Sequence, residues 1–130
     1  MTDASDAIWN RAAIESGGPS PRSGDEALAS LLRAHSLAMS GGLLDAVERM
    51  SPDELDAAQN GYRAFDLPEV AAVIAHVRTE LGRDDLSDAE LDALAGEADA
   101  RYADVVATDA IIVDRFERRL TLAPDDFAPA

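Results

Sequence analysis

Residues 51–82 read SPDELDAAQNGYRAFDLPEVAAVIAHVRTELG, and this stretch carries the clearest fold signal in the chain. Ser51 is a preferred helix cap, Pro52 fits a first helical turn, and Glu54 completes a capping box. The start chemistry is repeated by Asp66-Leu-Pro-Glu69, and Gly82 then supplies a helix stop. The stretch therefore predicts two consecutive helices with a short connection.

Apolar residues recur at steps of three and four through both segments and through the rest of the chain. This period marks the buried face of an amphipathic helix, and runs with period two are missing. The sequence therefore predicts an all-α fold: a single compact domain of six or seven mostly antiparallel helices. The residues expected to face the core are Ile8, Trp9 and Ala12; Leu28, Leu32, His35 and Met39; Leu55, Ala58, Tyr62 and Phe65; Val70, Ile74, Val77 and Leu81; Leu91, Leu94, Ala98, Tyr102 and Val105; and Val113, Phe116 and Leu120.

The chain is expected to form one domain over residues 1–130. Another capping box, Ser87-Asp-Ala-Glu90, opens a late helix, and Thr108 is expected to cap the last one. The predicted divisions are an N-terminal helix over residues 1–16, a Gly/Pro linker over 17–24 that is too short to separate two domains, a helical core over 25–122, and an irregular tail over 123–130.

Charge restricts the partners of this chain. Asp and Glu number 26 against 11 basic residues, all of them Arg, which gives a formal net charge of -15. A phosphate backbone needs a cationic face and an anionic membrane repels an acidic one, so we expect no direct nucleic-acid binding and no membrane binding. Without Cys there is no disulfide or zinc-thiolate site. The acidic N-terminus lacks an apolar segment, so we expect no secretory signal and a cytoplasmic location.

Catalytic and metal-binding motifs are missing from the sequence. The histidines, His35 and His76, are not at metal-ligand spacing, and His35 lies on an apolar stripe that is typical of a core histidine. Part of a calcium loop is imitated by Asp88-Ala-Glu-Leu-Asp92, but Ala93 occupies the position that requires Gly. We expect no enzymatic activity, no cofactor and no metal, and an enzyme with an acidic metal site stays open as an alternative.

Residues 84–99 contain seven acids and no base. On a helical wheel, Asp88, Asp92 and Asp99 share one flank of the apolar stripe. Along a helix this density is roughly one acid per 3.4 Å, comparable to the charge of one DNA strand. A solvated face that keeps the protein soluble, or an adaptation to salt, would produce the same pattern.

The run LLRAHSLAMSGGLL, residues 31–44, resembles the Gly-Gly element of a bacterial all-helical family that is named after a DNA-mimic member. The segment YRAFDLPEVAAVI, residues 62–74, and the late Phe116 and Phe127 are similar in placement, so the resemblance extends from Asp25 to Phe127. Family members often carry Asn before the Gly pair and an aromatic residue after it, where this chain has Ser40 and Leu43. We therefore interpret Gly41 and Gly42 as a structural turn, which glycine permits because it has no Cβ.

The resemblance implies an acidic protein-interaction module whose carboxylates stand in for phosphates. Such a module would occupy the DNA-binding face of a basic protein, for example a transcription regulator. The alternative is an interaction or immunity-type protein whose partner does not bind DNA, and a homodimer stays open. The acids assigned to partner binding are Asp84, Asp85, Asp88, Asp92 and Asp99.

Overall fold

Helices account for nearly all of the regular structure in the computed structural model, which describes residues 1–130. No strand is present, and the all-α prediction is confirmed. None of the helices combines the length and the apolar character needed to cross a bilayer. The elements are α1 (Asp3–Glu15), α2 (Ser23–Gly41), α3 (Leu43–Arg49), α4 (Pro52–Ala64), α5 (Pro68–Leu81), α6 (Asp88–Val105), α7 (Asp109–Leu122) and a 3-10 turn, η1 (Pro124–Asp126).

The capping boxes at the starts of α4 and α6 form as predicted. The Ser51 hydroxyl accepts a hydrogen bond from the Glu54 N–H at 3.2 Å, and the Glu54 carboxylate accepts one from the Ser51 N–H at 3.1 Å. Ser87 and Glu90 repeat this exchange. These pairs satisfy backbone donors that a helix N-terminus otherwise leaves without partners.

Of the start chemistry predicted for α5, Pro68 does occupy the first turn, but the polar side-chain cap does not form. Asp66 adopts a left-handed conformation with φ of 59°, and the residue that precedes α5 is Leu67, which makes no side-chain cap. The Leu67 side chain is buried, and its N–H donates to the Tyr62 carbonyl at 2.8 Å. Burial of Leu67 and this backbone bond, rather than a polar cap, therefore fix the turn. Thr108, which precedes α7, makes no side-chain cap either.

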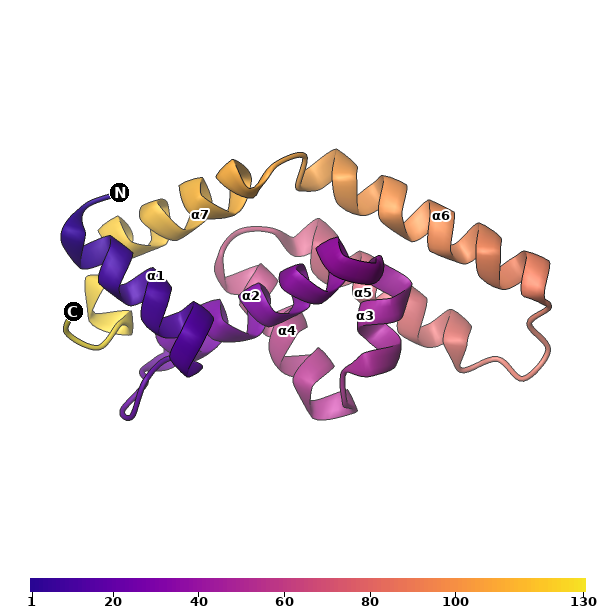
Figure 1. The fold of residues 1–130 in the computed structure, drawn as a ribbon, viewed down its shortest axis with the longest axis horizontal. Coiled ribbons are helices and arrows are strands. Elements are labelled where there is room, and N and C mark those ends of the chain that lie inside the picture. The colour runs from indigo at the N-terminus through magenta and orange to yellow at the C-terminus, as the bar shows by residue number, and fades with distance from the viewer.

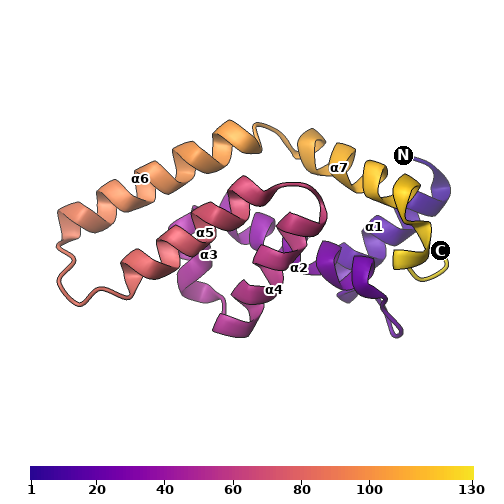
Figure 2. The ribbon, with the colours of Figure 1, turned by 180° about the vertical axis from the view of Figure 1, so that it is seen from behind.

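Figures 1 and 2 show how the helices are arranged. Helices α5 and α6 fold back on one another, and the loop between them forms one end of the molecule. Helix α7 follows α6 along the length of the molecule but at an angle to it, so the two helices together form an arch over α1–α5. Both termini lie at the opposite end, where α7 lies beside α1.

A single cluster of 25 buried apolar residues includes members of all seven helices. The stripe predicted for α2 is wrong in register, because the buried residues are Leu28, Leu31 and Ala34 while Met39 is 65% exposed. The reason lies in α4: a Cβ at Gly61 would lie 2.5 Å from the carbonyl oxygen of Ala27. This close approach turns the Leu31 side of α2 toward α4. In α7 the buried residues are Ile112 and Phe116, and Val113 and Leu120 are half-buried.

Apart from the η1 turn, the last residues form no regular element, and they are docked on the helices. Phe127 is buried against Phe116 and Phe65, with ring centroids 5.7 and 6.4 Å away. The buried carboxylate of Asp25 accepts a hydrogen bond from the Ala128 N–H at 2.7 Å.

The same Asp25 carboxylate also organises the start of α2. It accepts hydrogen bonds from the Arg22 N–H at 3.0 Å and from the Arg11 guanidinium at 2.9 Å. Helix α2 accordingly begins at Ser23, inside the predicted 17–24 linker. Asp25 therefore ties α1, the start of α2 and the C-terminal segment into one unit.

We expect Asp25→Asn to lower the free energy of unfolding by about 2 kcal/mol at neutral pH, since three hydrogen bonds lose their charged acceptor. Burial raises the pKa of Asp25, but the hydrogen bonds from Ala128, Arg22 and Arg11 lower it by more, so the folded-state pKa lies below 3.8. The stabilisation that the Asp25 charge provides is thus fully present above the unfolded-state pKa, and it is lost as the pH falls through the lower folded-state pKa.

Urea unfolding of both proteins at neutral pH and at about pH 2.5 tests this expectation. The difference between wild type and Asp25→Asn should shrink in acid. An equal difference at both pH values would contradict the role given to the Asp25 charge.

Candidate functional site

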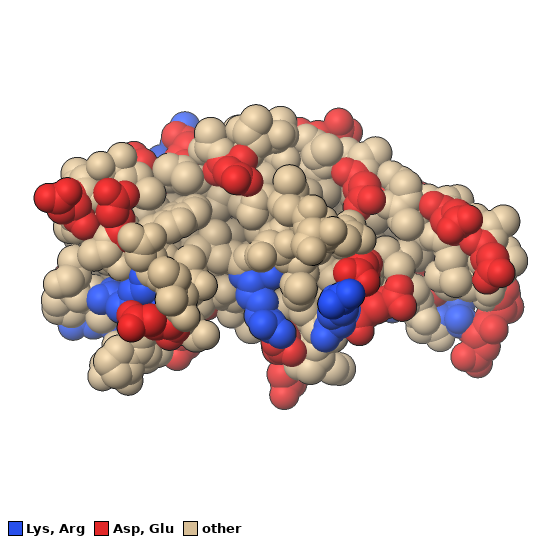
Figure 3. All heavy atoms as spheres, in the orientation of Figure 1, with Lys and Arg blue, Asp and Glu red and all other residues tan.

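The predicted acidic residues gather in part at the end of the molecule where α5 and α6 are joined. Asp84 and Asp92 line a shallow hollow of about 390 Å³ together with Glu48 of α3. Asp88 is the first residue of α6 and is exposed. Figure 3 shows acidic side chains concentrated at this end. We call this region the acidic end, and its residues are Glu80, Asp84, Asp85, Asp88, Glu90 and Asp92.

Arg83 is the one basic residue within this segment. Its guanidinium lies 3.0 Å from Glu80, 3.2 Å from Asp85 and 3.7 Å from Glu90. Hydrogen bonds to Asp85 and Glu80 raise the pKa of Arg83 above its usual range, and the same contact lowers the pKa of Asp85. Asp85 is therefore partly neutralised, whereas Asp84, Asp88 and Asp92 form no ion pair and are left to face solvent.

Asp99 is not part of the acidic end, which corrects the sequence-based assignment. It follows Asp88 by eleven residues, or about 16 Å along α6. Its Oδ1 accepts a hydrogen bond from the Leu43 N–H at 2.9 Å, at the first residue of α3. A carboxylate at this position accepts a hydrogen bond from a free N–H at the helix N-terminus, and its negative charge interacts favourably with the helix dipole. Asp99 thus joins α6 to α3 and has a structural role.

The turn predicted at Gly41 and Gly42 is present, and the two glycines differ in what they do. Gly42 separates α2 from α3 with φ of 91°, and its N–H donates to the Ala38 carbonyl at 2.8 Å. A Cβ at Gly42 would also lie 3.2 Å from Oδ2 of Asp99. Gly41 is the last residue of α2, and a Cβ there would meet only the movable carboxylate of Asp45. Gly42 is therefore the residue that the turn requires.

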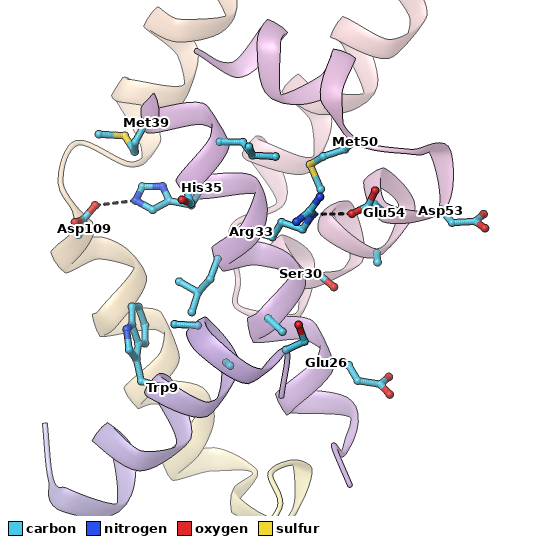
Figure 4. A pocket seen from close by; sticks show the side chains of 18 residues that line it. Trp9, Glu26, Ser30, Arg33, His35, Met39, Met50, Asp53, Glu54 and Asp109 are labelled. Carbon is cyan, nitrogen blue, oxygen red and sulfur yellow. Dashed lines mark hydrogen bonds and ion pairs between the residues drawn. The ribbon is translucent and has the colours of Figure 1, made fainter. Parts of the chain in front are cut away.

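A chain of three hydrogen bonds crosses the core beneath α6 and α7. The hydroxyl groups of Tyr62 and Tyr102 lie 2.8 Å apart, and the Tyr102 hydroxyl lies 2.6 Å from Nδ1 of His35. His35 Nε2 lies 2.7 Å from Oδ1 of Asp109 (Figure 4). Every donor is used when Tyr62 donates to Tyr102, Tyr102 donates to Nδ1, and Nε2–H donates to Asp109. We call these four residues the hydroxyl–imidazole chain.

The hydroxyl–imidazole chain contains the residue types of a catalytic relay, but its two tyrosine hydroxyls are buried away from solvent. Tyr102 is 5% exposed, and burial is the main cause that raises its pKa to about 12. Tyr62 is fully buried, and burial also raises its pKa well above the usual range. Both ring nitrogens of His35 are already engaged, and of the four groups only the Asp109 carboxylate is exposed. The effect of the chain is to connect α2, α4, α6 and the start of α7.

The sequence predicted His35 as a core histidine, and in the structure its ring makes two hydrogen bonds. The sequence did contain a signal for the hydroxyl–imidazole chain. Tyr62, Tyr102 and His35 all lie on apolar stripes, and buried aromatic residues with polar tips need partners. Which of them meet depends on how α2, α4 and α6 pack, so spacing alone could not pair them.

A second hollow, of about 1000 Å³, lies along the exposed side of α2. Figure 4 shows Trp9, His35, Met39 and Asp109 on one side of α2, and Arg33 with Glu54 on the other. Sequence reasoning missed this hollow, because the predicted register of α2 placed Met39 in the core.

No group of three His, Asp or Glu side chains lies close enough together to hold a metal ion. His76 is half-exposed, and its Nε2 lies 4.0 Å from Glu97. Comparisons with family models, curated proteins and solved structures yield no match to this chain. The resemblance to the DNA-mimic family therefore stays a prediction from the sequence.

We expect Gly42→Ala to lower the free energy of unfolding by about 1 kcal/mol or more, since the new side chain would need a left-handed backbone beside Asp99. Gly41→Ala is the matched control and should be neutral or slightly stabilising, because Ala favours a helix. Thermal unfolding of the two variants measures the difference. Equal melting temperatures for both would show that the turn does not depend on the conformation of Gly42.

Proposed function

We propose that this protein is an acidic protein-interaction module that binds a basic partner through its acidic end. The observation that supports this proposal is the charge balance there. Six acids lie within residues 80–92, and the single base among them, Arg83, is shared by three of the six. Asp84, Asp88 and Asp92 are exposed at one end of the molecule and form no ion pair.

The chemistry of this surface favours a partner rich in Arg and Lys. Carboxylates that are not already paired can accept charge-assisted hydrogen bonds from guanidinium and ammonium groups. Each exposed pair contributes only about 0.2–1 kcal/mol, so several must act together. The same charge speeds encounter with a cationic partner and makes binding sensitive to salt.

Apolar side chains at the acidic end can add contact area to these charges. Leu86 and Leu91 are half-buried and line the same hollow as Asp84 and Asp92. Burial of apolar surface between carboxylates gives shape selectivity that charge alone does not provide. The arrangement is suited to a protein partner rather than to small cations.

A basic surface that accepts these carboxylates is, in chemical terms, one that accepts phosphates. We therefore propose that the partner is a DNA-binding protein and that this protein competes with DNA for it, as the resemblance implies. The alternative is a partner that does not bind DNA, with the acidity serving solubility or salt tolerance. Competition with DNA separates the two, because only the first makes binding mutually exclusive.

The test begins with proteins captured from a lysate of the source organism and eluted with a salt gradient. The captured partner is then titrated against the protein in the presence of fluorescent duplex DNA. We expect Asp84→Asn/Asp88→Asn/Asp92→Asn to weaken binding by at least about tenfold and to flatten its salt dependence. Displacement of DNA by the wild type, and not by this variant, is the expected result.

The matched control is Asp3→Asn/Asp6→Asn/Glu117→Gln, which removes three exposed charges from α1 and α7. It changes the net charge equally but leaves the acidic end intact, so it should bind like the wild type. Equal weakening by both triple variants would mean that only net charge matters. Simultaneous binding of DNA and this protein to the partner would support the alternative.

A further inference from the structure

Helix α2 presents an uncovered face that the acidic end does not explain. Helices α1, α3 and α4 contact α2, yet Met39 remains 65% exposed. Trp9, Leu32 and Met50 are further apolar residues that line the hollow along this face, and Ala13 lies exposed at its edge. Figure 3 shows a broad uncharged area across the middle of the molecule, with acidic side chains around much of it and basic side chains at its lower edge. We use the name α2 face for the surface lined by Trp9, Ala13, Leu32, Met39 and Met50.

A fixed carboxylate lies beside the apolar residues of the α2 face. Asp109 receives a hydrogen bond on Oδ1 from His35, whose ring is itself held by the buried Tyr102 hydroxyl. The Asp109 side chain is 77% exposed, and its Oδ2 accepts no hydrogen bond from the protein. Figure 4 places it next to Met39 and on the same side of α2 as Trp9. The site therefore offers one oriented anion next to apolar contact area.

Apart from Arg33, the remaining charged residues around the hollow are acidic. Glu26 and Asp53 are exposed and form no ion pair. Arg33 is the only basic residue in the lining, and its guanidinium lies 2.6 Å from the Glu54 carboxylate. The surface that a ligand meets is thus apolar in the middle and negative at its edges. The complementary ligand is apolar along one stripe and positive on both sides.

We propose that the α2 face docks an amphipathic helix of a partner protein, with basic residues on either side of its apolar stripe. The hollow runs from Glu26 to Met39, which is about 20 Å of helix axis. That length matches three to four turns of a docked helix with apolar anchors at helical spacing. One Lys or Arg of the partner would bind the free oxygen of Asp109, and an apolar residue one turn away would lie between Trp9 and Met39.

A partner protein is favoured over a second copy of this chain. The chain carries a net charge of -15, so two copies repel one another, and the edges of the α2 face are negative. This site lies apart from the acidic end, and its test does not depend on the function proposed there.

The probe is a capped synthetic peptide of about 16 residues without Trp, with Leu at one helical stripe and Lys on both flanks. Trp9 is the only Trp in the chain and lines the hollow, so its fluorescence reports occupancy directly. We expect a saturable change in Trp9 emission. A second peptide that keeps the Leu stripe but has Glu in place of Lys should bind at least about tenfold more weakly.

Two matched pairs of variants locate the binding. Ala13→Lys places a cation in the hollow and should weaken binding by about tenfold, whereas Ile14→Lys adds the same charge outside it and should have little effect. Asp109→Asn keeps an acceptor for His35 while removing the charge, and should weaken binding by about fivefold. Asp104→Asn, an exposed acid of α6, is its control.

Three results would overturn the proposal. One is the lack of a saturable change in Trp9 emission with the Lys peptide. Another is equal affinity for the Lys and Glu peptides, or equal weakening by Ala13→Lys and Ile14→Lys. The third is a dimer in sedimentation that Ala13→Lys dissociates, which would assign the α2 face to a second copy of the chain. Circular dichroism of each variant checks that its fold is retained.

Discussion

The hydroxyl group of Tyr102 lies between a second buried tyrosine and a histidine, and its hydrogen bonds connect α6 to the helices beneath it. Tyr102 belongs to α6, Tyr62 to α4 and His35 to α2, and the chain ends at Asp109 in α7. Buried polar groups of this kind are costly when a partner is lost and stabilising when all are satisfied. These four side chains therefore help to hold α6 and α7 over the other helices, together with the apolar core.

Both candidate surfaces depend on that arrangement. The hydroxyl–imidazole chain meets the arch where its two helices join, through Tyr102 near the end of α6 and Asp109 at the start of α7, and Val106 between them is also buried. On one side of this point, α6 runs out to the acidic end. On the other side, the first residue of α7 is Asp109, which His35 orients toward the α2 face. A shift of the α6–α7 junction would move the acidic end and the Asp109 carboxylate relative to α2.

Much of the fold could be predicted because its signals are local. A capping box such as Ser51–Glu54 lies within one turn, and the buried stripes of α4 and α5 follow from their own spacing. Gly42 adopts a φ of 91°, which glycine reaches without the steric cost that a Cβ would add. The register of α2 was not predictable in this way, because Leu31 and Leu32 both fit a helical period. The choice depends on Gly61, which lies on another helix.

The candidate sites were likewise predictable only where their signal is local in the sequence. The acidic run marks the acidic end, but charge spacing could not reveal that Asp99 caps α3 or that Asp85 pairs with Arg83. The α2 face and the docking of Ala128 on Asp25 join residues that are far apart in sequence. Such contacts are set by tertiary packing, so no local pattern specifies them.

The measurement that tests this account most directly is a comparison of Tyr102→Phe with Tyr62→Phe. Loss of the Tyr102 hydroxyl leaves both the Tyr62 hydroxyl and His35 Nδ1 without their partner, whereas loss of the Tyr62 hydroxyl leaves the bond to His35 intact. We expect Tyr102→Phe to lower the free energy of unfolding by about 2–3 kcal/mol, and Tyr62→Phe by about 1 kcal/mol or less. Amide hydrogen exchange at the junction between α6 and α7 should rise only in Tyr102→Phe. Equal costs, with unchanged exchange at the junction, would contradict the central role of the chain.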